Sequence, residues 1–371
     1  MTSNDSGGAV LRGGPAFVVS GPGRRATDTP DAAGRILGLD AARGLAILGM
    51  LAAHTLHSDG DAFYDGRSSI VFAVLAGISL GLMTGGADGL PRENRARARL
   101  SVAIRALLLI ALGLGLWLLD TDVAIILDSY GFLFLLCLPL LFANRWVLAG
   151  VAAACALGGP IIIVALVAVT DPSGAIPVSS DDVAAVPRGW LAGYYPAPVW
   201  LGYVVAGLFL ARSGITRSFT LAVMVAGGAL VAALGYAISS AVGDPVIAHT
   251  DTTAEAVSSG ALAVALIGLL VAALSRIRNR AVTLAMKPLT AAGSMPLSIY
   301  TAQILVLAIL ALVHENSGEY SPEQSTALFV SLALGSLAFG TLWSIRFAQG
   351  PLEWLFARVT LRRPWRSQPT P

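Results

Sequence analysis

The stretch that decides the fold is Gly38–His57, which reads GLDAARGLAILGMLAAHTLH. It is long and apolar enough to cross a bilayer as an α-helix, yet it contains Arg43 and His54, which are costly inside hydrocarbon. On an α-helix these two residues are separated by about 1100° and about 16 Å along the axis, so they share one face with Ile47 and Met50 between them. The sequence therefore predicts a membrane-spanning helix that carries a polar, functional stripe.

The composition of the whole chain agrees with a membrane protein. Of its 371 residues, 56% are hydrophobic and 12% are charged, against about 25% charged in soluble proteins. The net charge of +2 argues against a nucleic-acid partner. We expect free, buried thiols at Cys137 and Cys155. The predicted organisation is a disordered cytoplasmic tail at 1–34, a transmembrane domain at 35–357 and a cytoplasmic tail at 358–371.

Apolar runs predict an all-α, polytopic transmembrane helix bundle with about ten spans. Every Lys and Arg except Arg67 and Arg188 then falls on one side of the membrane, so the positive-inside rule puts both termini in the cytoplasm. Much Ala, Gly and Arg indicates a bacterial genome, hence a bacterial plasma membrane. We expect loops near 86–99, 144–145, 212–218 and 276–295 on the cytoplasmic side. The predicted spans are 37–57, 68–85, 100–119, 123–143, 146–169, 197–212, 219–242, 256–275, 296–313 and 326–346.

The polar stripe of the first span has two interpretations. In the structural one, Asp40 favours a helix N-terminus, Arg43 reaches to the headgroups and His54 lies at the far interface. In the functional one, His54 is a general base near neutral pH, and Arg43 binds phosphate or carboxylate with its planar fork. Asp40 lies one turn before Arg43 on nearly the same face, which favours the functional interpretation.

Several motifs resemble a family of membrane enzymes. Leu39-D-x-x-R-G, with His54 fourteen residues after Asp40, resembles the first helix of membrane acyltransferases that modify sugars. A closer resemblance is to the heparan-α-glucosaminide N-acetyltransferase-like proteins and related bacterial membrane proteins of unknown function. The segments that carry it are Arg35–Met50 (RILGLDAARGLAILGM), Gly66–Gly77 (GRSSIVFAVLAG), Pro288–Gln303 (PLTAAGSMPLSIYTAQ) and Gly350–Phe356 (GPLEWLF).

The resemblance implies transfer of an acyl group, most simply acetyl, from cytosolic acyl-CoA to an acceptor outside, without a bound cofactor. The catalytic histidine carries over to His54 by spacing. In the animal enzyme, however, the histidine lies in the loop before the second span, within H-x-x-W-N-G, which is absent here. His57 is the nearest residue to that position, so the assignment stays open between His54 and His57. Asp40 and Arg43 are expected at the acyl-CoA site.

Other candidate site residues lie at the starts of the second and fourth spans. Asp65 and Arg67 precede or open the second span, either as part of a turn or as acceptor-binding groups. Asp128 lies several residues into the fourth span, where a carboxylate needs a partner. We expect that partner to be His54 or Arg67, unless Asp128 simply lies near the interface. Tyr130 is a further candidate for acceptor binding.

The remaining polar stretches have simpler interpretations. Gly189–Trp200 is typical of an aromatic belt, and His249–Glu255 is a polar loop without the spacing of a metal site. The basic run Arg92–Arg99 fixes topology and touches anionic lipid, although it could also suit the phosphates of CoA. No metal ligand set is expected.

Two function classes follow. The first is an integral membrane acyltransferase with acyl-CoA as donor, a sugar, glycan or lipid-linked acceptor, and membrane lipids as its surroundings. The alternative is a membrane transporter or permease that uses Arg43 and Asp128 as substrate or proton sites. The sequence does not set the oligomeric state.

The predicted topology is tested by cysteine labelling. Cysteines introduced at Ser58, Ser180 and Ser317 should react with a membrane-impermeant thiol reagent added outside intact cells, because these positions lie in the acidic, outer loops. A cysteine at Ser213 should not react. Labelling at Ser213, with protection of the other three, would invert the model.

Overall fold

The computed structural model describes residues 35–56, 62–119, 121, 123–170, 186–277, 279–314 and 321–360. Within these ranges the chain is helical and contains no strand. The elements are α1 (Leu37–Thr55), α2 (Arg67–Met83), α3 (Arg92–Trp117), α4 (Leu127–Cys137), η1 (Leu140–Phe142), α5 (Arg145–Thr170), α6 (Val186–Ala192), α7 (Ala197–Arg212), α8 (Ser218–Ala222), η3 (Val223–Gly227), α9 (Gly228–Ala241), α10 (Thr253–Arg276), α11 (Arg280–Gly293), α12 (Pro296–His314), α13 (Pro322–Arg346) and α14 (Pro351–Val359).

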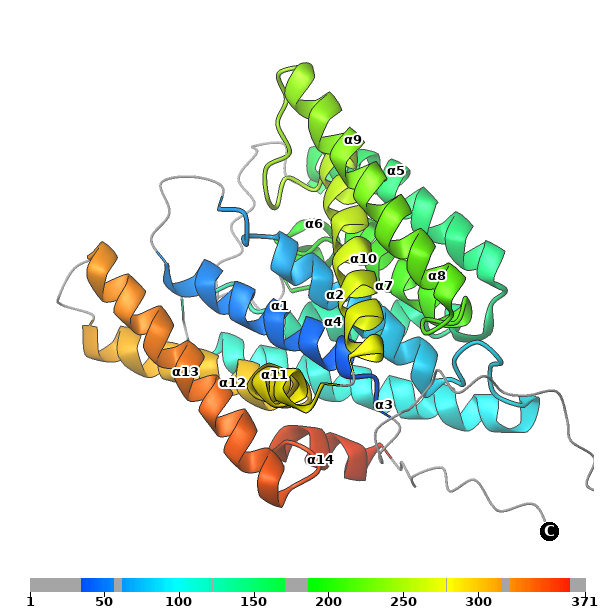
Figure 1. Cartoon of the computed structure of the whole chain (residues 1–371). Helices are drawn as coiled ribbons and strands as arrows, with labels where there is room; N and C mark the ends of the chain where they lie inside the picture. The colour runs from blue at the N-terminus through cyan, green and yellow to red at the C-terminus, as the bar shows by residue number, and fades with distance from the viewer. Residues whose placement is uncertain are drawn as a thin grey trace, which may run out of the picture.

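Helix α1 lies at the centre of the bundle, where it packs against α2, α10 and α11 (Figure 1). Over its most apolar stretch, 61% of α1 is buried inside the protein, whereas the figure is 6% for α5 and 11% for α13. Helices that expose nearly all of an apolar surface are typical of contact with lipid rather than water. The central and peripheral helices therefore differ in their surroundings, and the polar stripe of α1 lies in the enclosed part.

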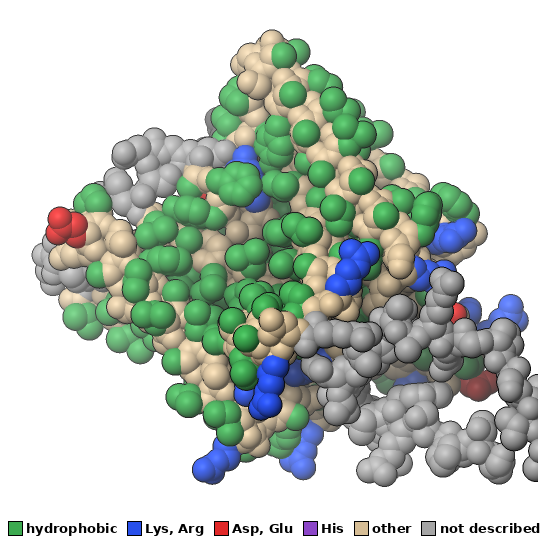
Figure 2. Space-filling model, in the orientation of Figure 1, with side chains coloured by type: hydrophobic (Ala, Val, Ile, Leu, Met, Phe, Trp, Pro, Cys, Tyr) green, Lys and Arg blue, Asp and Glu red, His purple; other side chains and the backbone are tan. Residues whose placement is uncertain are grey.

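The surface shows the same division. Hydrophobic side chains cover most of the face in Figure 2, and the Lys and Arg side chains gather mainly along its lower and right-hand part. We call this part the basic end of the bundle. Arg35 before α1, Arg95 in α3, Arg145 in α5 and Arg212 in α7 belong to it, because each lies where its helix begins or ends on that side. By the positive-inside rule, this is the expected cytoplasmic end.

Glycines allow the central helices to approach each other closely. A Cβ atom on Gly207 of α7 would lie 2.0 Å from the carbonyl oxygen of Val74 in α2, and one on Gly77 of α2 would lie 1.8 Å from that of Val204. A Cβ on Gly293 of α11 would lie 1.7 Å from the carbonyl oxygen of Asp40 in α1. Small residues at such crossings are a common means of helix association in membranes.

The all-helical, multi-pass prediction is confirmed. Each of the ten predicted spans contains a helix, and seven helices of the described ranges are long and apolar enough to cross a membrane. An eighth span results if α6 and α7, which are bent by 65°, are counted together. The apolar helices α2 and α4 are shorter, with 17 and 11 residues. The total of ten spans stays a prediction.

The loop expected at 276–295 was wrong, because α11 occupies most of it. This helix has no long apolar run; it is amphipathic and packs against α1 and α13. The basic run 92–99 is likewise helical, as the first two turns of α3. Both segments were too polar for a hydropathy criterion. For α11, packing against α1 and α13 supplies the stability that its own composition lacks.

Substitution of Gly207 by alanine should destabilise the bundle, because the added methyl group meets the backbone of α2, which cannot rotate away. The expected loss is about 1–3 kcal/mol of unfolding free energy, measurable as a lower melting temperature in detergent. Gly150→Ala on α5 is the matched control, since nothing lies within 4 Å of a Cβ there. Equal melting temperatures for Gly207→Ala and the parent chain would contradict the α2–α7 contact.

Candidate functional site

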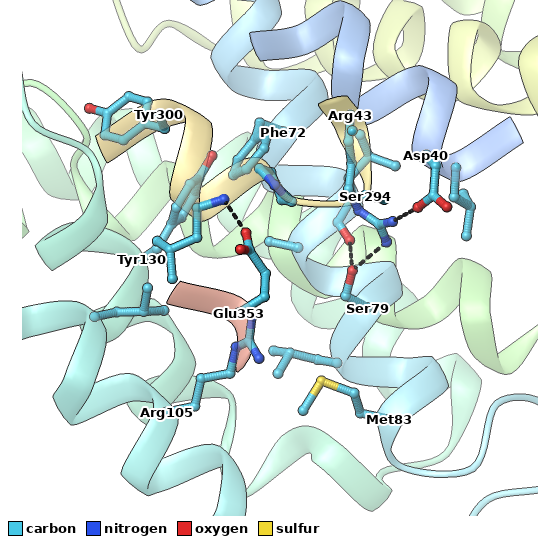
Figure 3. Close-up of a pocket in the computed structure, with 18 of the residues that line it drawn as sticks. Asp40, Arg43, Phe72, Ser79, Met83, Arg105, Tyr130, Ser294, Tyr300 and Glu353 are labelled. Atoms are coloured by element: carbon cyan, nitrogen blue, oxygen red, sulfur yellow. Dashed lines mark hydrogen bonds and ion pairs between the residues drawn. The ribbon is translucent and has the colours of Figure 1, made fainter. Parts of the chain in front are cut away.

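A cavity of about 570 Å³ opens at the basic end and extends into the bundle between α1, α2, α3, α4, α12 and α14. Its size lies within the range of about 300–1,000 Å³ that is usual for small-molecule sites. Figure 3 shows its polar residues around a common space, with Asp40 and Arg43 on one side and Arg105 and Glu353 on another. The cavity is therefore the main candidate for a ligand site in the described part of the chain.

The mouth of the cavity carries more positive than negative groups. Arg35, Arg43 and Arg105 line it, against the carboxylates of Asp40 and Glu353. Arg43 donates from Nη1 to Oδ1 of Asp40 at 2.6 Å and from Nη2 to Oγ of Ser79 in α2 at 2.9 Å (Figure 3). Asp40 and Arg43 are thus in direct contact, as their spacing on α1 predicts. The two hydrogen bonds fix the orientation of the guanidinium fork, which suits it to bind an anionic group.

The interior of the cavity is mostly apolar. Phe72 and Tyr130 stack with their ring centroids 5.7 Å apart, and the Tyr130 hydroxyl donates to the carbonyl oxygen of Ser69 at 3.1 Å. Tyr130, considered above as an acceptor-binding residue, therefore belongs to the wall of this cavity. Met50 of α1 also lines the cavity, and it lies one helical turn before His54.

Glu353, in the motif Gly350–Phe356, contacts the motif Pro288–Gln303. Its Oε1 accepts from the backbone N–H groups of Leu297 at 2.7 Å and Ser298 at 3.2 Å, and its Oε2 accepts from the hydroxyl of Ser298. A carboxylate at this position satisfies the free N–H groups at the start of α12 and interacts favourably with the helix dipole. The contact holds α14 beside the cavity mouth. We did not predict it, because the partners are 55 and 56 positions apart in the chain, beyond the reach of local sequence patterns.

His54 lies in the last turn of α1 and is partly exposed. Within the described part of the chain its imidazole has no hydrogen-bond partner. The end of α1 lies beside the start of α2, because a Cβ on Gly49 would touch the side chain of Ser68 at 2.0 Å. His57 lies outside the described residues, and the choice between the two histidines stays open.

Asp65 and His249 form a polar contact that we did not predict. Nε2 of His249 lies 3.5 Å from Oδ1 of Asp65, which also accepts from the backbone N–H of Gly66 at 2.9 Å. The contact with His249 is the largest effect that lowers the pKa of Asp65; the Gly66 N–H and the charge of His54 lower it further. The carboxylate of Asp65 therefore lies within electrostatic reach of both histidines.

The loop that carries His249 is held by a buried carboxylate. His249 and Asp251 have left-handed backbone angles, with φ of 58° and 50°, which cost about 1–2 kcal/mol each for residues other than glycine. Glu255 accepts from the backbone N–H of His249 at 2.8 Å and that of Asp251 at 2.7 Å. Strained backbone angles are often found at functional sites. The sequence of the polar run 249–255 does not show these angles, so the sequence alone did not indicate a site here.

Aromatic rings surround His249. The centroid of Tyr194 lies 4.1 Å from that of the imidazole, and the ring of Trp200 is nearly parallel to it at 6.5 Å. Trp200 donates from Nε1 to Oδ1 of Asp251 at 3.0 Å. Tyr194 is 49% exposed, so part of this aromatic group is open to a ligand. The segment considered as an aromatic belt thus contributes directly to a group that we call the histidine cluster, which consists of His249, Asp65, Asp251, Tyr194 and Trp200.

The partner expected for Asp128 was wrong. Its Oδ2 accepts from the indole Nε1 of Trp190 in α6 at 2.8 Å, and not from His54 or Arg67. Arg67 instead donates to the hydroxyl of Tyr236 at 2.9 Å and to the carbonyl oxygen of Val246 at 3.2 Å. An indole N–H is a neutral donor, and no charge pattern in the sequence indicates it.

These features define an all-helical, multi-pass membrane protein with a cationic cavity at one end and a histidine cluster toward the other. Residues 206–363 match a family model described as "Protein of unknown function (DUF418)", a family of membrane proteins. The matched part includes His249, Glu255 and Glu353 but not α1. A search of curated proteins found no match for this chain.

The histidine cluster should make stability depend on pH through Asp251. Burial, followed by the charge of Glu255, raises its pKa from 3.8 to about 7. At a pH between these two values, Asp251 is protonated in the folded state and ionised in the unfolded state. The free energy of unfolding therefore falls as the pH rises through this range, and it stays low above it. In Asp251→Asn the acceptor for Trp200 remains but the titration is gone.

We therefore expect the melting temperature of the parent chain to fall by a few degrees relative to Asp251→Asn between pH 5 and pH 8. Asp244→Asn, in the same loop but exposed, is the control and should follow the parent. Parallel curves for Asp251→Asn and the parent would show that Asp251 does not titrate in this window.

Proposed function

We propose that the chain is an integral membrane acyltransferase. In this proposal an acyl group, most simply acetyl, passes from acyl-CoA at the basic end to a hydroxyl or amine of a sugar or lipid-linked acceptor at the histidine end. The basic end is then the cytoplasmic one, as the positive-inside rule predicts. The membrane in this proposal is the plasma membrane of a bacterium. Acyl-CoA is a substrate here, and no bound cofactor is required.

The observation that carries the proposal is the shape and polarity of the cavity. Its mouth holds Arg35, Arg43 and Arg105 together with the carboxylates of Asp40 and Glu353, and its interior is mostly apolar. Met50, which also lines it, lies one helical turn before His54. An acyl-CoA is an anionic head joined to a long, less polar arm with a reactive thioester at its far end. The cationic mouth suits the phosphates, and the apolar interior suits the arm and the acyl group.

His54 supplies a group for the chemical step. As a general base it removes the proton from the acceptor hydroxyl or amine, and the acceptor atom forms a bond to the thioester carbonyl carbon. The carbon–sulfur bond breaks, and the CoA thiolate leaves and takes up the proton from the imidazolium. Asp65, whose charge reaches His54, stabilises that imidazolium.

The surroundings of His249 suit the acceptor. Sugars commonly bind where an aromatic face lies beside carboxylate and imidazole groups, because the ring stacks while the hydroxyls form hydrogen bonds. Tyr194, half-exposed, lies beside His249 and Asp65. These side chains provide both kinds of contact next to the end of α1.

The decisive experiment measures release of free CoA from radiolabelled acetyl-CoA by the purified protein in proteoliposomes, with glucosamine and lipid-linked sugars as trial acceptors. His54→Ala should lower the rate by about 10²–10⁴-fold, while binding of desulfo-CoA in a thermal-shift assay stays unchanged. Arg43→Lys should raise the KM for acetyl-CoA more than it lowers kcat, since it keeps the charge but loses the fork. Arg43→Ala should raise the KM for acetyl-CoA further, because a charged hydrogen bond worth about 1.5–3 kcal/mol of binding free energy is lost.

Arg346→Ala is the matched control, because Arg346 is exposed at the end of α13 and does not line the cavity. Full activity in His54→Ala would remove His54 from the reaction and direct attention to His57. Unchanged acetyl-CoA kinetics in both Arg43 variants would remove Arg43 from the donor site. An intact thioester in the parent chain under all conditions would refute the acyltransferase and leave the transporter as the alternative.

A further inference from the structure

A second hollow, of about 480 Å³, lies at the basic end and is separate from the cavity described above. Three connections form its walls: residues 87–89 after α2, residues 142–146 at the start of α5, and the turn between α7 and α8 with Arg212 and Arg217. Arg95 of α3 completes it. The two cavities have no lining residue in common.

The hollow concentrates positive charge. Four guanidinium groups line it, from Arg95, Arg145, Arg212 and Arg217, and the single carboxylate is that of Asp88. No ion pair within 4.0 Å joins Asp88 to any of these four arginines, all of which the structure describes. Like charges around one space repel each other, and an anion bound between them would relieve that repulsion. The charge therefore points to an anionic ligand.

Arg212 makes one wall rigid. It donates from Nη2 to Oγ1 of Thr84 at 2.7 Å and to the carbonyl oxygen of Leu141 at 2.6 Å, and from Nη1 to the carbonyl oxygen of Gly86. These bonds tie the end of α7 to the end of α2 and to η1. The side chain of Arg212 thus fixes the ends of α7, α2 and η1 relative to one another. A wall that is fixed before the ligand binds lowers the cost of binding.

Apolar side chains that face away from the protein lie next to the hollow. Trp146, in the first turn of α5, lines the hollow and is 68% exposed, and the guanidinium of Arg145 lies 5.1 Å from the centroid of its ring. Val147 on α5 is 50% exposed, and Phe219, two residues after Arg217, is 81% exposed. A ligand here would therefore have an anionic head in the hollow and apolar chains along α5 and α8.

We propose that this hollow is a binding site for the phosphate headgroup of an anionic phospholipid from the leaflet at the basic end. The phosphate lies between the guanidinium groups of Arg95, Arg145 and Arg217, and the acyl chains run along the exposed apolar residues of α5 and α8. Arg212 holds the wall of the site. Basic pockets at the cytoplasmic ends of membrane helices are suited to such headgroups. The proposal is independent of the acyl transfer proposed above.

The test is a titration of the purified full-length chain, in detergent, with four probes: phosphatidylglycerol, phosphatidylcholine, glycerol 1-phosphate and inorganic phosphate. The readouts are the number of lipids retained in native mass spectrometry and the shift in melting temperature. We expect binding of phosphatidylglycerol alone. The double variant Arg145→Gln/Arg217→Gln should bind it at least about tenfold more weakly, because two charged hydrogen-bond donors are lost.

The matched control is Arg280→Gln/Arg346→Gln, which removes the same charge from exposed positions outside the hollow and should bind as the parent does. If the double variant does not fold, Arg217→Gln alone tests the site, since Arg217 is exposed. Equal binding of phosphatidylcholine, or equal weakening in the control variant, would overturn the proposed site. Binding of glycerol 1-phosphate or inorganic phosphate as tight as that of the lipid would overturn the assignment to a lipid.

Discussion

The interaction on which the site depends is the pairing of Arg43 with Asp40 and Ser79. A guanidinium within an apolar helix is costly unless its donors are satisfied. Asp40 provides a carboxylate one turn earlier on the same helix, and Ser79 provides a hydroxyl from α2. Because both side chains are largely buried, α1 has to lie inside the bundle, where α2 and α11 can pack against its two flanks.

This placement of α1 shapes the cavity. Gly293 of α11 packs against the backbone of Asp40, so α11 approaches α1 closely and closes one side. On another side Glu353 attaches α14 to the start of α12 at the cavity mouth. At the mouth Asp40 binds Arg43 and Glu353 binds the start of α12, and the interior is left to Met50, Phe72 and their apolar neighbours. The mouth is charged and the interior apolar because the carboxylates of Asp40 and Glu353 both accept hydrogen bonds at the mouth.

At the opposite end of α1 the polar groups belong to loops. Asp65 precedes α2, and His249 lies in a loop that Glu255 holds in a strained conformation. Gly66 has a φ of 60°, and a Cβ there would meet Ala248 at 2.9 Å. The close approach of these two loops therefore needs glycine at that position. The result is a carboxylate shared electrostatically by His54 and His249, near the last turn of the central helix.

The sequence by itself determined the class of fold, because apolar runs of this length have few alternatives to membrane helices. It also determined the α1 stripe, since 3.6 residues per turn places Asp40, Arg43 and His54 on one face. Only the tertiary structure decided the partners: Trp190 for Asp128, His249 for Asp65 and Glu353 for the start of α12. Helix periodicity acts over a few residues, whereas these contacts join segments far apart in the chain. Their geometry depends on how the helices pack, and α11 became visible as a helix for the same reason.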